Sequence, residues 1–487
     1  MNLFRWLFVI GIISMLMYSC RRDDYYEGRD VSITFSEDTL RFDTVFTTLG
    51  SATRFVKLKN SKNQPVLVDV KLKNLSNLFF RINVDGIKGS DVRSVEISAN
   101  DSIYLFVEVT IDPNKPLSIS PFVIEDQVEV TVNGNTSILY LEAWGQNANY
   151  ITPTDGKGKS FLYSCNLGER IWNDPKPYVI YGILYIDSCK VVWPAGTRIY
   201  VHGGIVRDTS SIYNDGLMVF LKNGSLDSRG TIAQPVVIQG DRLEKDFEDV
   251  KSQWVGMLFW QQSINNKLSN TIIKNSIIGI RADSMAQLSM YACQIHNTGG
   301  TALIGRHANI YAENCLFSDN AAYGIQLTYG GKYTFNYCTV GNYQGQNAAI
   351  YMDDVHCEDF FCSADTRRLN HLKATFANCI FAGNDKDEVQ LNRYGKGQVN
   401  FDYMFKNCVV KVDELILPNN YPDFFDFCTS CINVKSTDKL FLKRNDGDFR
   451  LDTMSVALGK ALPLANVPRD IIDKVRKTKP DIGCFEF

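Results

Sequence analysis

The chain has 487 residues, of which 45% are hydrophobic and 22% charged, so it has ample material for a packed core and lacks the composition of a disordered protein. Lys and Arg total 51 against 54 Asp and Glu, and this net charge of −3 argues against a nucleic-acid-binding protein, which needs concentrated positive charge. Tyr and Phe number 23 and 29 while Pro numbers only 14, which favours β-structure and excludes collagen-like and proline-rich classes.

The N-terminal segment has the pattern of an export signal. Trp6–Tyr18 is an apolar run of 13 residues, too short for a membrane-spanning helix of about 20 residues but typical of a secretory signal. A small residue directly before Cys20 resembles the lipobox of bacterial lipoproteins, although Met17 stands where Leu is usual. The resemblance implies a signal peptide over 1–19 and two acyl chains on Cys20, enough for stable membrane anchoring. A plain signal peptide cleaved nearby is the alternative.

Residues 20–29 are expected to be a linker, and 30–150 to be an Ig-like β-sandwich. About seven alternating apolar and polar runs, separated by turn clusters, occupy this stretch, as in Val66–Val70 and Ile103–Val109. No Cys lies between residues 21 and 164, so the bridge typical of antibody domains is absent.

A repeat of about 22 residues begins near residue 260 and predicts a right-handed parallel β-helix over 151–487, closed by a C-terminal cap. The same local frame recurs around one column of small residues: Thr271, Cys293, Cys315, Cys338, Cys379 and Cys408. Apolar residues stand two positions after and three positions before each of them, as expected for short strands with one buried face. The class is therefore all-β, a sandwich followed by a solenoid.

The cysteine column is interpreted as a buried ladder of free thiols. Thr271 occupies the column in one coil, so a thiol is not required there. Spacing alone leaves disulfides within the column open, but parallel Cβ directions in stacked coils are poor disulfide geometry. Asparagines four or five residues later are expected to adopt left-handed turns: Asn275, Asn297, Asn320, Asn342 and Asn384.

Several short motifs are similar to those of Bacteroidota surface lipoproteins that combine an N-terminal Ig-like module with a C-terminal parallel β-helix. They lie at residues 42–48, 80–86, 100–103, 240–244, 448–452 and 481–487, and Arg21–Asp24 resembles the surface-export signal of that group. The resemblance covers nearly the whole mature chain. It implies an architecture and a location in the outer membrane, facing the cell surface, but no reaction.

Acidic residues offer one weak catalytic candidate. Asp353 and Asp354, near His356, are the only adjacent acidic pair in a plausible loop. Polysaccharide-cleaving enzymes need paired carboxylates or an acidic Ca²⁺ site, and no neighbouring coil supplies stacked acids. We therefore favour a solvated loop over a catalytic pair.

The remaining cysteines suggest disulfides more than metal sites. Cys357 and Cys362, flanked by His356 and His371, could bind Zn²⁺, but in an exported protein a disulfide between them is favoured. Further candidates are Cys428 with Cys431, either a tight bridge or a redox pair, and Cys165 with Cys189 at the domain junction. No metal and no cofactor are expected, and no glycine-rich loop supports nucleotide binding.

Aromatic residues crowd the longest coils: Tyr329, Tyr333, Tyr343, Tyr351, Phe360 and Phe361. They could stack on sugars, although packing is favoured. We expect a lipoprotein anchored in the outer membrane by its N-terminal lipid, with a non-catalytic binding or scaffolding role. Its partner would be a glycan, another cell or an outer-membrane protein complex. The alternative is a polysaccharide-active enzyme, a lyase or glycoside hydrolase, on the loop-rich flank of the solenoid.

Overall fold

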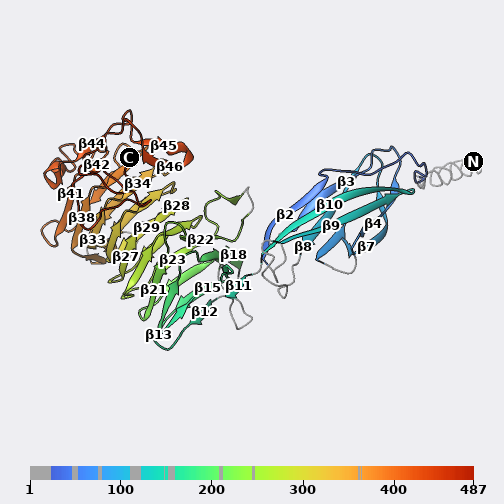
Figure 1. Ribbon diagram of the computed structural model, residues 1–487, viewed down its shortest axis with the longest axis horizontal. Helices are drawn as coiled ribbons and strands as arrows, with labels where there is room; N and C mark the ends of the chain where they lie inside the picture. Colours follow the sequence, from blue (N-terminus) through green and yellow to red (C-terminus); the bar gives the residue numbers. More distant parts are fainter. Residues whose placement is uncertain are drawn as a thin grey trace, which may run out of the picture. The chain divides into compact units, whose positions relative to one another are not determined.

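A computed structural model describes residues 24–46, 53–74, 79–109, 122–146, 148–151, 160–207, 212–243, 247–359, 362–363 and 365–487 (Figure 1). The chain divides into two compact units, Met1–Ala148 and Asn149–Phe487. Throughout the described residues the secondary structure is β-strand with short 3-10 turns, and no α-helix is present. The all-β class is confirmed. Residues 1–23, with the predicted signal peptide and Cys20, lie outside the described part.

The first unit consists of two five-stranded sheets. One has the order β1 (Thr34–Phe35), β3 (Arg54–Lys59), β8 (Ser102–Val109), β5 (Phe80–Val84), β6 (Ile87–Gly89). The other has the order β2 (Thr39–Phe46), β10 (Asn135–Gln146), β9 (Phe122–Val132), β4 (Val66–Leu72), β7 (Asp91–Ile97). All strand pairs are antiparallel except β2 with β10.

One hydrophobic core joins both sheets of this unit. Strand β4 shows why: its side chains alternate strictly between buried and exposed, so Val66, Val68 and Val70 face inward while Lys71 faces solvent. The described part of the expected linker, residues 24–29, contacts this sandwich of two sheets: the Tyr26 amide donates to the Pro65 carbonyl over 2.9 Å.

The second unit is a solenoid of three parallel sheets. The eleven-stranded sheet contains β11 (Asn149–Ile151), β14 (Tyr178–Ile180), β17 (Arg198–Val201), β22 (Val236–Gly240), β25 (Thr271–Lys274), β28 (Gln294–His296), β31 (Leu316–Ser318), β34 (Thr339–Asn342), β39 (Ile380–Gly383), β42 (Val409–Val410) and β44 (Ile432–Asn433). The nine-stranded sheet contains β12 (Ser160–Tyr163), β15 (Ile183–Ile186), β20 (Leu217–Phe220), β23 (Gly256–Phe259), β26 (Ile280–Ala282), β29 (Leu303–Arg306), β32 (Ile325–Thr328), β35 (Ile350–Asp353) and β40 (Val389–Asn392).

The ten-stranded sheet contains β13 (Gly168–Ile171), β16 (Cys189–Trp193), β21 (Gly224–Arg229), β24 (Asn266–Ser269), β27 (Gln287–Tyr291), β30 (Asn309–Glu313), β33 (Gly331–Asn336), β38 (Leu372–Ala377), β41 (Phe401–Lys406) and β43 (Cys428–Thr429). Three hairpins project from the coils: β18 (Gly204–Arg207) with β19 (Ile212–Asp215), β36 (Val355–Cys357) with β37 (Arg367–Leu369), and β45 (Phe441–Lys443) with β46 (Asp448–Leu451). Two 3-10 turns, η2 (Phe424–Phe427) and η3 (Arg444–Asp446), lie near the C-terminus.

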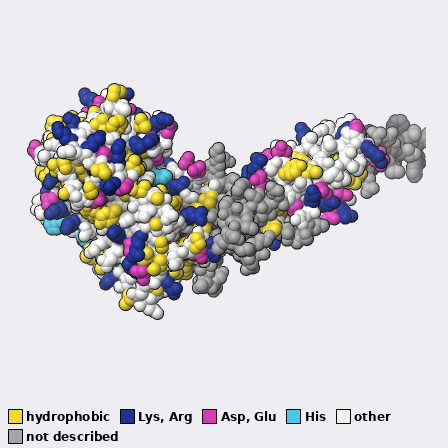
Figure 2. Space-filling model, viewed as in Figure 1, with side chains coloured by type: hydrophobic (Ala, Val, Ile, Leu, Met, Phe, Trp, Pro, Cys, Tyr) yellow, Lys and Arg dark blue, Asp and Glu magenta, His cyan; other side chains and the backbone are white. Residues whose placement is uncertain are grey.

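Stacked side chains of like type form the core of the solenoid. The apolar residue three positions before the cysteine column aligns from coil to coil in the ten-stranded sheet: Leu268, Met290, Ala312, Phe335, Phe376 and Phe405. All are fully buried. The repeat read from the sequence is therefore the repeat of the structure. Outside the core, Lys and Arg are interspersed with Asp and Glu over the visible face (Figure 2).

The cysteine ladder closes a tight turn between two sheets. Cys293, Cys315 and Cys338 are buried free thiols, and the Sγ of each donates to the carbonyl oxygen two residues earlier over 3.4–3.5 Å. Thr271 makes the same contact through its hydroxyl, 3.1 Å from the Ser269 carbonyl. Burial raises the pKa of these thiols well above the usual range, so they stay protonated and unreactive.

The expected left-handed turns lie elsewhere in the coil. Asn275 and Asn297 have positive φ, but Asn320, Asn342 and Asn384 do not, and the prediction is wrong for these three. Asn320 and Asn342 are buried, and their side chains form hydrogen bonds that stabilise the turns; Asn342 Nδ2, for example, donates to the Asn347 carbonyl over 2.8 Å. In the six coils of the column, the residue directly before the column position always has positive φ: Asn270, Ala292, Asn314, Tyr337, Asn378 and Asn407.

The C-terminal segment does not act as a simple end cap. Phe424, fully buried, packs on Tyr403 and Phe405 of β41 and so covers the end of the inner core. Residues from Val434 onward instead pack against the outer side of the eleven-stranded sheet, forming a second core with Leu316, Ile380 and Val409. Cys484 is buried there, and its amide donates to Thr339 Oγ1 over 3.0 Å.

The ladder gives a stability prediction. Cys315→Phe should destabilise most, since overpacking a filled core costs about 1–3 kcal/mol or more. Cys315→Ser should be intermediate, because burying a hydroxyl costs about 1–3 kcal/mol where its hydrogen bond is poor. Cys315→Thr should be mildest, because Thr271 already makes this turn. Thermal unfolding would rank the three variants, and a neutral Cys315→Phe would contradict the ladder, as would alkylation of Cys315 in native buffer.

Candidate functional site

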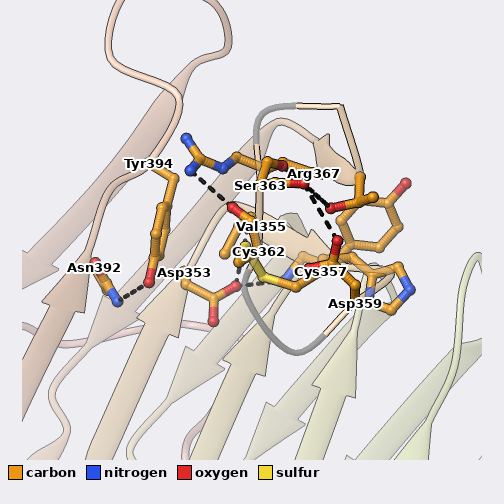
Figure 3. Close-up of a disulfide and its surroundings, with 12 residues drawn as sticks. Asp353, Val355, Cys357, Asp359, Cys362, Ser363, Arg367, Asn392 and Tyr394 are labelled. Atoms are coloured by element: carbon orange, nitrogen blue, oxygen red, sulfur yellow. Dashed lines mark hydrogen bonds between the residues drawn. A yellow bond between two sulfur atoms is a disulfide. The ribbon is translucent and has the colours of Figure 1, made fainter.

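The candidate site lies on the outer face of the nine-stranded sheet, beside the β36–β37 hairpin (Figure 3). The hairpin is inserted directly after β35, and a disulfide between Cys357 and Cys362 ties the end of β36 to the loop that connects it to β37. Phe360 and Phe361, predicted as aromatic loop residues, lie outside the described part.

Strand register aligns the outward side chains of neighbouring coils. Arg306 pairs with Thr328, and Asp353 with Asn392, at the ends of their strands. Two positions earlier in each strand, Gln326, Tyr351 and Gln390 form a second outward row. Because neighbouring strands lie about 4.8 Å apart, these polar and aromatic groups form one continuous surface.

Asp353 is held by backbone amides at the start of the hairpin. Its Oδ1 accepts from the Tyr329 amide over 2.7 Å and from the Val355 amide over 3.1 Å. Only 6% of the residue is exposed, and this burial raises the pKa of its carboxyl to about 6. The prediction of a solvated loop is therefore wrong for Asp353, because the inserted hairpin covers it.

Asp354 is fully buried, so the solvated-loop prediction is wrong for it as well. Its two carboxylate oxygens accept from the Tyr394 amide over 2.8 Å and from the Gly395 amide over 2.9 Å. Both oxygens are thus committed to positioning the chain after β40. Asp353 and Asp354 do not form a pair of free carboxylates of the kind that glycosidic hydrolysis uses.

Aromatic rings line the face around Asn392. Its Nδ2 donates hydrogen bonds of 3.3 Å to the hydroxyls of both Tyr351 and Tyr394. Tyr351 also packs against Tyr323, with ring centroids 5.4 Å apart. Tyr394 is 39% exposed, so its ring is available to a ligand.

The predicted aromatic residues thus divide into two groups. Tyr333 is a core residue, 1% exposed, and donates to the Gly330 carbonyl. Tyr343 packs on Phe441 and Phe449 of the C-terminal segment. Tyr329 and Tyr351 belong to the outer face, where Tyr329 contacts the ring of His356 at 5.5 Å.

Two arginines accompany these rings. Arg306 Nη2 lies 2.8 Å from the ring nitrogens of His356, and burial together with this guanidinium lowers the pKa of His356. The Arg367 guanidinium lies 5.3 Å from the centroid of the Tyr394 ring, and its Nη2 donates to the Cys362 carbonyl over 3.0 Å.

The four residues considered for zinc do not come together as ligands. Cys357 and Cys362 are bonded to each other, and His356 contacts Arg306. His371 Nδ1 accepts from the Asn400 amide over 3.0 Å. Among the residues that the structure describes, no cluster of His, Cys, Asp and Glu could hold a metal ion.

The other two candidate pairs are also disulfides. Cys165–Cys189 links the first two coils of the solenoid, and Cys428–Cys431 lies in the last coil. Neither bridge belongs to the nine-stranded sheet that carries the candidate face. Within the described ranges, no helix is long and apolar enough to cross a membrane.

Arg306, Arg367, Asn392 and Tyr394 were missed by the sequence analysis. Extending the coil alignment from the cysteine column into the nine-stranded sheet would have shown Arg306 and Asn392 at equivalent strand ends. Arg367 had no such signal, because the hairpin interrupts the repeat.

Comparison with known proteins bears on the fold. Residues 181–358 and 250–408 match the family model described as a right handed beta helix region. These residues lie within the solenoid of three parallel sheets, an architecture consistent with a right-handed β-helix. No curated protein matches the chain.

Solved structures with some likeness include the catalytic unit of a GH87 alpha-1,3-glucanase from Streptomyces thermodiastaticus, at 11% identity, TM-score 0.28, and coverage of 73% of this chain and 74% of that one. The SrpA adhesin from Streptococcus sanguinis has 10% identity, TM-score 0.20, and coverage of 29% and 69%. A family 123 glycoside hydrolase from Clostridium perfringens has 10% identity and TM-score 0.20, and the match covers 30% of this chain and 30% of that one. With TM-scores this low, these structures assign no activity.

The raised pKa of Asp353 predicts a pH effect on stability. A carboxyl whose pKa rises from 3.8 to about 6 on folding binds its proton more tightly in the native state, so the protein loses stability as pH rises from about 4 through 6. Two pKa units correspond to about 3 kcal/mol. Asp353→Asn removes this loss while keeping an oxygen for the Tyr329 and Val355 amides.

Thermal unfolding of both proteins from pH 4 to 7.5 would check this. Glu388, whose pKa burial raises to about 7, titrates in the same direction in both, so the difference between them reports Asp353. We expect the melting temperature of Asp353→Asn to rise relative to that of the wild type as pH increases. Parallel pH profiles of the two melting temperatures would contradict the raised pKa of Asp353.

Proposed function

We propose that this protein binds glycans, without cleaving them, through the outer face beside the hairpin. The observation that supports this is the Asn392 amide, which joins the hydroxyls of Tyr351 and Tyr394 in one surface. Aromatic rings offer flat apolar area with a polar edge, and amides and hydroxyls hydrogen-bond to sugar hydroxyls.

The shape of the face favours an extended ligand. The side chains come from successive coils, so similar chemistry repeats along the solenoid axis at the strand spacing of about 4.8 Å. Gln326, Tyr351 and Gln390 supply one such row. A polymer lying along the axis would meet several coils at once, and weak contacts would add up.

A polysaccharide-active enzyme is the second candidate, supported by the pKa of about 6 at Asp353. A carboxyl with a raised pKa suits a general acid. Glycosidic hydrolysis also needs a second carboxylate, and Asp354 is committed to backbone amides. We therefore place binding ahead of cleavage.

We further propose that the protein is exported and anchored in the outer membrane through Cys20, facing the cell surface. Three disulfides suit an oxidising compartment. Asp24 is already tied to the first unit, its carbonyl accepting from Gln64 Nε2. Only four residue steps separate Cys20 from Asp24, about 14 Å at full extension, so a lipid on Cys20 would hold this unit close to the membrane.

The first unit, which we propose to be an Ig-like sandwich, would then act as a spacer. The chain enters near the β9–β10 turn, where Asn133 Nδ2 donates to the Tyr26 carbonyl. It leaves after β10, which is 12 residues long, about 40 Å further along at the rise of an antiparallel strand. The entry and exit of this unit thus lie at opposite ends of its longest strand.

A glycan panel tests the binding function. We expect the purified protein to retain at least one polysaccharide in affinity electrophoresis, and Tyr394→Ala to weaken that binding about tenfold, or about 1.4 kcal/mol. Tyr140→Ala is the matched control, because Tyr140 is an exposed tyrosine on β10 of the first unit, outside the proposed face. Reducing ends or unsaturated products that disappear in Asp353→Asn would favour the enzyme instead, and failure to bind any glycan would contradict the proposal.

The anchor has its own test. Cys20→Ala should abolish labelling with palmitate and remove the protein from the outer-membrane fraction, because both acyl chains are lost. Protease treatment of intact cells should degrade the wild-type protein if it faces the surface. Unchanged labelling and fractionation of the variant would exclude the lipid anchor.

A further inference from the structure

We propose that the hairpin face selects glycans that carry anionic groups, uronate carboxylates or sulfates, through Arg306 and Arg367. This inference rests on the proposed glycan-binding function and names the class of ligand. The two guanidiniums stand on the outer face, one at the end of β29 and the other on β37.

Neither arginine has an acidic partner among the described residues, whereas Arg281 and Arg368 nearby do. Arg281 on the same sheet pairs with Asp283 over 2.9 Å, and Arg368 on the hairpin pairs with Glu358 over 2.9 Å. Among the described residues, Arg306 and Arg367 form no ion pair. Nε of Arg367 is buried without a hydrogen-bond partner, which is an unfavourable state for a charged group.

Most acidic side chains around them are paired or buried. Asp353 and Asp354 accept backbone amides and lie buried, and Glu358 is paired with Arg368. Asp359 Oδ2 accepts from the Ser363 hydroxyl over 3.2 Å, which leaves its carboxylate charged, and Asp365 is exposed on the hairpin loop. Arg306 and Arg367 supply unpaired positive charge on the face itself, although the chain as a whole is slightly negative.

The environment of each arginine suits an anionic sugar. Arg306 is held by His356, so its planar group is already oriented. Arg367 lies over one face of the Tyr394 ring, so a sugar in contact with the exposed part of that ring would bring a carboxylate or sulfate near the guanidinium. Guanidiniums bind such groups through two parallel hydrogen bonds, which a neutral sugar cannot replace.

Three polysaccharides separate the alternatives: polygalacturonate carries carboxylates, chondroitin sulfate carries sulfates as well, and dextran is neutral. Affinity electrophoresis and titration calorimetry at pH 7 would compare wild type with Arg306→Gln and with Arg306→Gln/Arg367→Gln. We expect at least one anionic polymer to bind about tenfold or more tightly than dextran, with binding weakened by salt. The relative affinity of the two polyanions identifies which group is recognised.

Arg368→Gln is the matched control, since it removes a hairpin arginine whose charge is already paired. The double variant should lose about tenfold or more in affinity for the preferred polyanion, and the control should change less than about twofold. Arg306→Gln alone leaves the Arg367 contact with the Cys362 carbonyl intact but removes the contact with His356 on β36, so its loss of affinity is assigned to the lost charge only if its melting temperature matches that of the wild type. Thermal melting checks the fold of every variant.

The outcomes distinguish the two proposals. Equal binding of dextran and polyanions, with sensitivity to Tyr394→Ala, would overturn the selection for anions and leave glycan binding standing. An equal loss in Arg368→Gln would overturn it too, because general positive charge would then suffice. Binding of none of the three, or of any wider glycan panel, would overturn both.

Discussion

Every coil of the second unit has to bury its inward side chains against the coils above and below it. The ladder from Leu268 to Phe405 shows this constraint, because each member is fully buried and aligned with the next. A residue inserted within a strand would shift the register and turn the inward set outward. Variation is therefore confined to turns, and the β36–β37 hairpin enters at the end of β35, where the register of the neighbouring strands is kept.

The same constraint explains the chemistry of the turns. A coil that changes direction within a few residues needs a residue with left-handed backbone geometry. It also needs a donor for the buried carbonyl at the end of the strand before the turn, which has no partner in the sheet. The residue before each column position supplies the first, and the thiol or hydroxyl of the column supplies the second. Cysteine fits because it is small, apolar and a weak donor. The column is thus a structural device.

The periodic part of the protein could be predicted from the sequence, and the site could not. The ladders follow from a spacing that repeats along the chain, so residues such as Ile295 and Phe317 could be assigned to the core without coordinates. Asp354 could not, because its burial depends on amides 40 residues later. Asn320 and Asn342 looked alike and equally suited to left-handed turns, yet tertiary hydrogen bonds gave them another role.

A face built on this lattice differs from a loop-based site in how it can discriminate. Arg306, Asp353 and Asn392 sit at the ends of hydrogen-bonded strands, and the disulfide from Cys357 to Cys362 holds the hairpin that carries Arg367. Side chains fixed in this way lose little conformational entropy when a ligand binds. They also cannot rearrange to satisfy a ligand that lacks the matching group. An arginine without an acidic partner, held in place beside an exposed ring, therefore discriminates against neutral ligands. A neutral ligand would cover the guanidinium and leave its charge unpaired, whereas an anionic ligand would pair with it.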